Sequence, residues 1–521
     1  MTILTIMTIV RVITVIIIFT NYFASGNGCR EAQKNQKNMK VVCKYQRKLL
    51  SATILYLIVV FPVCLSYAQS LIVTAEEEIV DSVERSGTDY SISPDDWQAL
   101  NKRLESLEAQ LKDEKSNAAK KKEVDSKKPS VKVSGRLQYE ADFFDQNDVS
   151  KARVGNMRNG TDLRRAWIGV AGSYKQFVYK CYFDLAPQNL AFKDVYLGIE
   201  DLPWLGDMRI GYFKEPSSVE QLTGVHQMWF NDRPLSMSGI SSYMQNRALG
   251  IAFSNGSRVQ DFLWTVGFFQ NCSDAIHKHY DDGYDPDDAR SGEGVTARFV
   301  KILWDCPDCG QILHIGSSFT YKAWNPNEKM NWGTRPEDDL GLKVVETGVF
   351  YGTTDTFMVS PELVFANNSF AVIAEYNYIR LKNRDMDDMN IHGGHVSVSY
   401  MLTGERYNYS KSTGTLTYIK PNVDFVRRCE NGAFQSGTGA WQALYRFSWI
   451  DYRQMPLLAG VNGDLSKVGI CYDHTFGLNW QMSQTFRVVF NFILSNNEYK
   501  YGTLNKSGHV NVFTTSVQMY F

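Results

Sequence analysis

The sequence predicts an all-β fold: a transmembrane antiparallel β-barrel of about 16 strands, preceded by a signal peptide and a short helix. Three observations predict it. Segments of about ten residues with apolar side chains at every second position recur from Val131 to Phe521. Aromatic residues make up 13 % of the chain and Gly accounts for 38 of its 521 residues, which suits short strands and tight turns. No stretch of that region is long and apolar enough for a spanning helix.

Residues 1–68 form a leader. The basic stretch Lys40–Lys48 precedes an apolar run, Ile54–Val63, and small residues follow it. This is the order of a secretory signal peptide. We expect translation to start at Met39 and cleavage to follow Ala68; the alternative is a membrane anchor at the N-terminus.

Residues 69–130 are mostly polar and charged, and they end in a Lys-rich linker. Within them, five apolar residues have spacings of 3, 4, 3 and 4: Trp97, Leu100, Leu104, Leu107 and Leu111. A seam that repeats every 3.5 residues predicts a coiled coil. We therefore expect a helix over residues 95–115 that joins subunits in the periplasm. The alternative is that the helix packs against its own barrel.

Residues 131–521 form the predicted barrel domain. Its strands are expected to begin near residues 131, 162, 177, 192, 207, 245, 261, 294, 310, 357, 370, 392, 437, 468, 485 and 509. Short connections such as Ser173–Gln176 alternate with long ones such as Lys214–Met244, as expected for a barrel with turns at one rim and loops at the other. Thr403–Ser436 is the exception, because it is long and falls on the short-turn side.

The last predicted strand has an apolar face that runs from Phe513 through Val517 to the C-terminal Phe521. A closing strand that ends on an aromatic residue is typical of a barrel in an outer membrane. A soluble β-sandwich or propeller is the competing fold, but it does not explain a signal peptide combined with this ending. The lipid of an outer membrane, in a Gram-negative-type bacterium, is therefore the expected surrounding.

Charge and cysteine content narrow the function further. The whole chain has a formal charge of -1, and its leader carries eight basic residues and one acidic residue, so the exported chain is acidic. An acidic chain argues against nucleic acid as a partner. Cys306-Pro307-Asp308-Cys309 has redox-motif spacing but falls at a predicted short turn, so a small disulfide is expected there. A single such pair is weak evidence for zinc, and no metal, cofactor or catalytic group is predicted.

Six motifs in the predicted barrel resemble the phosphate-selective porin O and P family. They are Leu163–Val170, Phe192–Gly198, Gly211–Pro216, Ser399–Arg406, Gly437–Arg446 and Gly477–Trp480. The resemblance implies a sixteen-stranded homotrimeric porin that carries anions through a basic constriction. It also implies that an external loop, matching Lys214–Met244, and a periplasmic segment, matching Thr403–Ser436, fold into the barrel.

Basic residues on the less apolar strand faces are the candidate lining of the pore: Arg136, Lys180, Arg209, Arg298, Lys322, Arg446 and Arg487. The resemblance adds Arg164 and Arg165, although strict strand alternation sends these two neighbours to opposite faces. Lys214 and Arg233, in or beside the inserted loop, complete the set. Five acidic residues also fall on the inward faces: Glu140, Asp184, Asp194, Glu375 and Asp473.

The expected function is passive diffusion of small anions, phosphate or polyphosphate, through this outer-membrane pore. The inward acids leave open a general porin with weak or cation selectivity. Two further alternatives are a structural protein tethered through its periplasmic helix and a barrel enzyme that uses His277 at the rim.

Overall fold

The computed structural model describes residues 129–521 except 187–189, 242, 245–246, 271–291, 429–431, 433, 456–466 and 501–506, together with Lys102 and Arg103. The leader, nearly all of the predicted coiled coil, and His277 lie outside these residues. The chain divides into two compact units, Met1–Glu114 and Lys115–Phe521. In the first, Lys102 and Arg103 are helical. Across the described residues, no helix has the length and hydropathy needed to cross a membrane.

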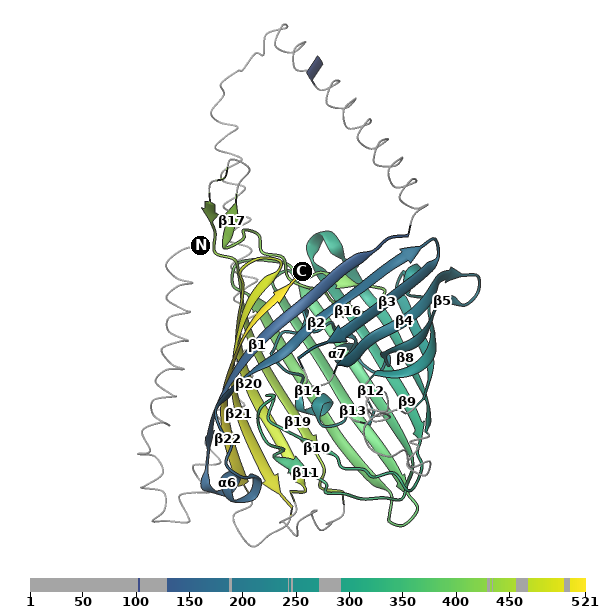
Figure 1. Cartoon of the computed structure of the whole chain (residues 1–521), viewed down its shortest axis with the longest axis vertical. Coiled ribbons are helices and arrows are strands. Elements are labelled where there is room, and N and C mark those ends of the chain that lie inside the picture. Colours follow the sequence, from purple (N-terminus) through teal and green to yellow (C-terminus); the bar gives the residue numbers. More distant parts are fainter. Residues whose placement is uncertain are drawn as a thin grey trace, which may run out of the picture. The chain divides into compact units, whose positions relative to one another are not determined.

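The second unit contains a closed antiparallel barrel of sixteen strands (Figure 1). In chain order they are β1 (Lys132–Gln146), β2 (Gly160–Tyr174), β3 (Phe177–Asp184), β4 (Ala191–Leu202), β5 (Gly206–Lys214), β6 (Arg247–Ser254), β7 (Phe262–Gln270), β8 (Glu293–Cys306), β9 (Gln311–Ala323), β12 (Thr353–Asn367), β13 (Phe370–Asn383), β14 (Met389–Met401), β19 (Ala440–Asp451), β20 (Gly469–Gln481), β21 (Phe486–Tyr499) and β22 (Ser507–Tyr520).

The predicted barrel is confirmed, and each predicted strand start lies within four residues of the observed one. The largest difference is at β12, which begins at Thr353 rather than 357, because its first residues are polar and extend beyond the apolar pattern. The barrel closes where β1 pairs with β22, with Arg136 opposite Tyr520.

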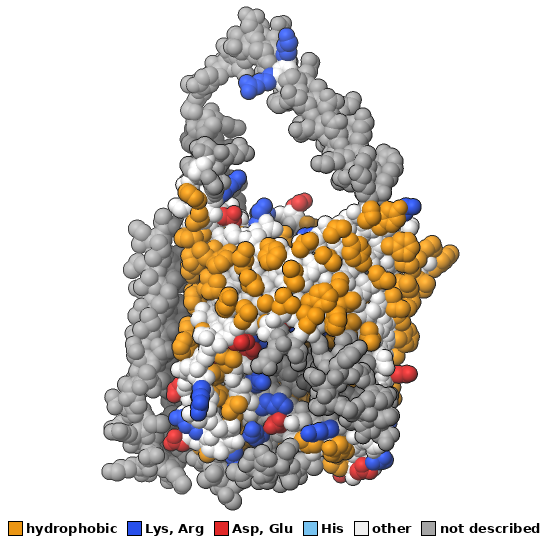
Figure 2. All heavy atoms as spheres, viewed as in Figure 1, with side chains coloured by type: hydrophobic (Ala, Val, Ile, Leu, Met, Phe, Trp, Pro, Cys, Tyr) orange, Lys and Arg blue, Asp and Glu red, His pale blue; other side chains and the backbone are white. Residues whose placement is uncertain are grey.

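Side chains alternate between the two faces of each strand, as the period of two predicts. On β1, Leu137 and Tyr139 are 39 % and 60 % exposed, whereas the intervening Gln138 is fully buried. The exposed apolar side chains form a band on the barrel exterior, visible in Figure 2. The apolar face therefore meets lipid, and the polar face lines the interior.

Three long connections carry short elements of their own. Segment 215–246 contains α7 (Val219–Leu222) and α8 (Leu235–Ser238); segment 324–352 contains β10 (Gly333–Thr334) and β11 (Val345–Glu346). Segment 402–439 contains β15 (Tyr409–Ser410), β16 (Thr415–Leu416), β17 (Val426–Arg428) and β18 (Phe434–Ser436). The remaining short elements are α6 (Asp148–Val154), η2 (Gly256–Arg258) and η4 (Pro307–Cys309).

Parts of all three segments pack against inward-facing strand residues. Leu235 of segment 215–246 and Trp332 of segment 324–352 belong to one buried cluster with strand residues such as Ile379. Leu416 of segment 402–439 belongs to a second, with Ile312 and Val364. The interior of the barrel is therefore narrowed by its own chain.

The closing seam depends on Phe521. Its backbone exchanges two hydrogen bonds with Gly135, Gly135 N to Phe521 O at 2.9 Å and Phe521 N to Gly135 O at 3.2 Å. Its ring lies against Gly135 so closely that a Cβ there would sit 2.2 Å from the ring. Gly at position 135 is thus required by the terminal aromatic side chain.

Deleting Phe521 is expected to destabilise the closing seam by about 2–3 kcal/mol, because both hydrogen bonds and the ring contact are lost. The measurement is the temperature at which the folded protein converts to the unfolded band on a gel. Phe521→Tyr keeps the ring and the backbone bonds, and it should behave as wild type. Equal melting temperatures for the deletion and for Phe521→Tyr would contradict this role.

Candidate functional site

The interior of the barrel has two unlike walls. Inward cations on β8, β9 and β19 are almost inaccessible: the side chains of Arg298, Lys322 and Arg446 are 1 %, 4 % and 3 % exposed. On β2 and β3, the side chains of Arg164 and Lys180 are 26 % and 30 % exposed. The inserted segments pack against the strands from β8 to β22 and against β1, where Arg136 and Arg487 are also only 5 % exposed. Solvent reaches the wall formed by β2 to β6 at Arg164 and Lys180.

On the buried wall, Glu362 of β12 holds two of the inserted segments. Its carboxylate accepts from Arg298 (Nη2–Oε1 2.6 Å), from His314 (Nε2–Oε1 2.9 Å) and from the backbone N–H of Val219 (2.8 Å). Arg298 also donates to the carbonyl oxygens of Thr413, at 2.7 Å, and Gly414, at 3.0 Å. This Glu362 junction fastens segments 215–246 and 402–439 to the strands.

The other two buried cations are paired in the same way. Lys322 meets Glu215 at 2.7 Å, and Arg446 meets Glu337 of segment 324–352 at 2.5 Å. Arg298, Lys322 and Arg446 thus face the interior, as the strand pattern predicts, but each is neutralised by a buried glutamate.

A β-bulge in β2 lets the side chains of both Arg164 and Arg165 face the interior of the barrel. Gln138 of β1 pairs with Arg165, and the next residue, Tyr139, pairs with Leu163, so Arg164 is the extra residue. Both arginines reach interior partners: Arg165 donates to Gln138 Oε1 at 2.8 Å, and Arg164 meets Asp232 at 3.0 Å. The prediction that alternation separates them was wrong, because a bulge breaks the period of two.

Arg164 lies between two inserted segments. Asp232 of segment 215–246 and Asp339 of segment 324–352 approach it at 3.0 and 2.9 Å. The pKa of Asp232 is lowered despite its burial, because Arg164 and Arg165 stabilise the carboxylate. The three charged groups link the tips of the two segments.

Three other interior arginines form no direct ion pair with a described carboxylate. Gln518 Oε1 accepts from both Arg136 (2.8 Å) and Arg487 (2.7 Å), and Gln138 Oε1 accepts from both Arg136 (2.7 Å) and Arg165 (2.8 Å). Within the described part of the chain, no carboxylate lies within 4.0 Å of these three guanidinium groups. We call Arg136, Arg165 and Arg487 the arginine triad.

The triad retains unused donors. Nε and Nη1 of Arg136 and Nε of Arg487 are buried and have no hydrogen-bond partner among the described residues. The side chain of His226, on segment 215–246, lies nearby. Its pKa is lowered to about 3, first because burial disfavours the charged imidazolium and then because Arg136 and Arg487 repel the proton. Three neighbouring guanidinium groups, each positively charged, give this part of the interior a positive potential.

A small cavity adjoins the triad. Arg487, His226 and Gln227 line it together with Tyr418 of segment 402–439. Arg487 also donates to the carbonyl of Met228 at 2.7 Å. Segments 215–246 and 402–439 thus meet beside the triad.

A second basic group lies on the solvent-accessible wall. Asp194 of β4 pairs with Lys180 and with Arg247, each at 2.8 Å. Lys193 meets Asp184 at 3.2 Å and stacks over the ring of Trp167. The sequence pattern missed Lys193 and Arg247, because Lys193 sits at a second register shift and Arg247 begins a strand beside the long loop.

The three remaining predicted residues lie near this wall. Lys214 donates to the carbonyls of Gln221 and Thr223 at 2.7 and 3.1 Å. Arg233 lies 3.8 Å from Glu220, and Arg209 stacks over Tyr196. Three predicted inward acids also accept hydrogen bonds. Glu140 accepts one from the side chain of Gln138. Glu375 accepts one from the backbone N–H of Glu220, and Asp473 accepts one from the backbone N–H of Glu337.

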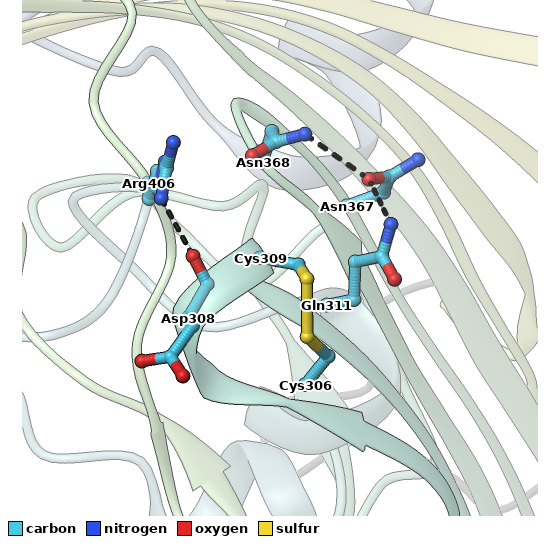
Figure 3. The surroundings of a disulfide bond; sticks show 7 residues. All are labelled: Cys306, Asp308, Cys309, Gln311, Asn367, Asn368 and Arg406. Carbon is cyan, nitrogen blue, oxygen red and sulfur yellow. Dashed lines mark hydrogen bonds between the residues drawn. A yellow bond between two sulfur atoms is a disulfide. The ribbon is translucent and has the colours of Figure 1, made fainter.

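Cys306 and Cys309 form a disulfide with their Cα atoms 5.3 Å apart, at the turn between β8 and β9 (Figure 3). Cys181 and Cys471 are free thiols. The described residues include no group of three or more His, Cys, Asp and Glu arranged to hold a metal ion.

Comparison with solved structures finds similar proteins at low identity. The anion-selective porin from Comamonas acidovorans has 10 % identity and a TM-score of 0.45, with 76 % of this chain and all of that chain covered. OprB of Pseudomonas putida has 8 % identity and a TM-score of 0.46, covering 78 % and 97 %. The DcaP channel of Acinetobacter baumannii has 9 % identity and a TM-score of 0.42, covering 75 % and 97 %.

No curated protein matches the sequence. A family model does, and it covers three quarters of the chain. The model described as phosphate-selective porin O and P matches residues 131–521, the entire barrel, and the chain therefore belongs to this family of outer-membrane porins.

Proposed function

We propose that this porin lets small anions, phosphate or polyphosphate, diffuse passively across the outer membrane, and that the arginine triad attracts and briefly holds them. The observation that carries the proposal is three neighbouring guanidinium groups with amide partners in place of carboxylates. A cation that forms no ion pair with a protein acid keeps its full charge, so the triad would attract an anion toward the buried guanidinium groups of Arg136 and Arg487.

Arginine suits this role for a physical reason. Its planar guanidinium can offer two parallel N–H donors to a phosphate, whereas Lys acts as a point charge. Arg136 (Nε and Nη1) and Arg487 (Nε) have unused N–H groups, which are buried, so an anion would have to enter beside the cavity at Arg487 to reach them. Two amide oxygens hold the triad in place, and because an amide is neutral it fixes the guanidinium groups without lowering the local potential.

The accessible wall would guide anions toward the triad. Lys180, Lys193 and Arg247 lie there and share two aspartates, Asp184 and Asp194, so cations outnumber acids in this group. Lys214, whose amino group donates to the backbone carbonyls of Gln221 and Thr223, and the exposed Arg209 add positive charge. Arg298, Lys322 and Arg446 would act as anchors for the inserted segments.

A general porin with weak selectivity is the second candidate. It is favoured by Asp232 and Asp339, which neutralise Arg164 on the accessible wall. If these acids dominate the potential along the path, small anions and cations would pass at similar rates.

We further propose a homotrimer whose subunits meet at a low wall of the barrel. Strands β3 to β7 have 8 to 12 residues, whereas β8 to β22 have 12 to 15 in the barrel. A neighbouring subunit would cover these short strands. The rim with short turns would face the periplasm together with the N-terminal segment. Cross-linking that yields a limiting species other than a trimer would contradict this assembly.

The proposal is tested by adding inorganic phosphate to channels that carry chloride in a planar bilayer. A phosphate ion held at the triad should block the chloride current, with half-block at millimolar phosphate or below, which corresponds to about 4 kcal/mol of binding. Sulfate at equal ionic strength is the control for specificity. Absence of any block by phosphate would exclude the triad as a phosphate site.

A further inference from the structure

The disulfide-closed turn lies where a dissolved thiol can reach it. Cys309 is exposed and Cys306 is half-buried, on the rim with the short turns. Between them Pro307 begins the one-turn helix η4, and Gly310 follows with a left-handed backbone, φ 60°. The bond therefore closes a small covalent loop at the surface.

This turn contacts the start of segment 402–439. Nη1 of Arg406 donates to the carbonyl of Asp308, inside the disulfide loop, at 2.7 Å (Figure 3). The carbonyl of Gly310 accepts from the N–H of Asn368 at 3.0 Å, and Asn368 in turn accepts from the N–H of Tyr407 at 3.2 Å. Residues 406 and 407 are thus held from both sides by the disulfide turn and its neighbour.

A second contact lies one residue before the disulfide. Asp305 of β8 pairs with Lys411 at 2.5 Å. Side-chain exposures of 20 % for Asp305 and 38 % for Lys411 place this pair within reach of water. The conformation at Cys306 therefore bears on the Lys411 contact as well as on the Arg406 contact.

Beyond these contacts the segment enters the barrel. Tyr409 hydrogen-bonds to His314 at 2.9 Å, and the carbonyls of Thr413 and Gly414 accept from Arg298. Thr417 and Tyr418 then line the cavity that contains Arg487. Segment 402–439 thus runs from the disulfide turn at the rim to the cavity beside the arginine triad.

We propose that the Cys306–Cys309 disulfide is a site of thiol–disulfide exchange with a periplasmic dithiol oxidoreductase, and that its oxidation state sets how firmly segment 402–439 is held across the barrel. The disulfide fixes the Asp308 carbonyl that Arg406 uses. The reduced turn has more conformations, so it presents that carbonyl for less of the time.

The chemistry is a two-step exchange. A thiolate of the oxidoreductase attacks Sγ of the exposed Cys309, the bond between Cys306 and Cys309 breaks, and Cys306 leaves as a thiolate that takes up a proton. The second thiol of the oxidoreductase then attacks the mixed disulfide and releases Cys309 as a thiol. Two electrons and two protons pass to this chain, and the oxidoreductase becomes the disulfide.

Trypsin sensitivity of the folded, detergent-solubilised full chain tests the proposal without any assumption about transport. Lys411 lies in the segment and is followed by Ser412, so trypsin can cleave after it. After treatment with a phosphine reductant, cleavage at Lys411 should become about fivefold faster, because proteolysis follows the population of the released segment. The reductant acts on protein that is already folded, so a folding defect cannot imitate the result.

Two variants assign the effect. C306S/C309S should be cleaved at the fast rate with or without reductant. C272S/C429S removes two cysteines outside the described residues and should respond to reductant as wild type does. Equal cleavage rates for oxidised and reduced wild-type protein, a response that persists in C306S/C309S, or free thiols at both positions in never-reduced protein would each overturn the proposal.

Arg406→Gln provides an independent variant, because it removes the side chain that reaches Asp308 and leaves the disulfide intact. It should be cleaved at the fast rate even when oxidised. Single-channel recordings supply a second readout that rests on the proposed function: reduction should increase open-channel current fluctuations about twofold. Faster cleavage in a channel that proves not to favour anions would refute the proposed selectivity and leave this inference standing.

Discussion

Glu362→Gln is expected to lower the free energy of unfolding by about 3–5 kcal/mol, because it leaves Arg298 as a buried charge without a counter-ion. The Arg298 and Glu362 side chains are 1 % and 0 % exposed, so water cannot replace the lost carboxylate. The substitution also weakens the hydrogen bond that the N–H of Val219 donates to residue 362. Arg298 becomes less firmly placed, so its hydrogen bond to the carbonyl of Thr413 weakens as well. Urea unfolding in lipid vesicles measures the first effect, and current noise in a bilayer measures the second.

Glu375 supplies the matched control. It lies directly opposite Glu362 on β13 and accepts the N–H of Glu220, the residue after Val219. Among the described residues, however, no cation lies within 4.0 Å of its carboxylate. Glu375→Gln should therefore change the unfolding free energy by about 1 kcal/mol or less. Equal losses in the two variants would show that the buried ion pair is not the source of the effect.

The double variant R136Q/R487Q is expected to lower the ratio of anion to cation permeability about tenfold, which requires a loss of only about 1.4 kcal/mol. A unit charge about 6 Å from an ion, at an effective dielectric constant of 20, contributes about 3 kcal/mol. Gln is neutral and two bonds shorter than Arg, so the substitution removes the charge without narrowing the path. Reversal potentials under a KCl gradient provide the measurement.

Arg380→Gln controls for the loss of an arginine elsewhere. Arg380 lies on β13 with its side chain 52 % exposed, paired with Asp388 at 2.6 Å. Solvent screens that pair, so the variant should keep the wild-type reversal potential. An unchanged reversal potential in R136Q/R487Q would contradict the role assigned to the triad.

The barrel could be predicted from the sequence because its signal is local. A strand between lipid and water must alternate apolar and polar side chains, so each start could be placed from neighbouring residues alone. The long connection on the short-turn side, Thr403–Ser436, could also be recognised from its length. The same alternation assigned Arg136 and Arg487 to the inward face, where both lie.

The arrangement inside the barrel could not be predicted, because it depends on distant contacts. Nothing near Arg298 in the sequence indicates that Glu362, 64 residues later, neutralises it. The bulge at Arg164 adds one residue to a strand without changing its composition, so alternation gives the wrong face. The acids that pair with Arg164 come from segments without periodicity. A basic residue on an inward face could therefore be identified, but its pairing could not.

We propose that the arginine triad, none of whose members forms an ion pair with a described carboxylate, makes this porin favour anions. The most direct test is the zero-current potential of the wild-type channel in a planar bilayer that separates two KCl concentrations. We expect a potential with the sign of chloride selectivity, which moves toward zero as salt on both sides is raised and screening increases. A potential with the sign of potassium selectivity would contradict it.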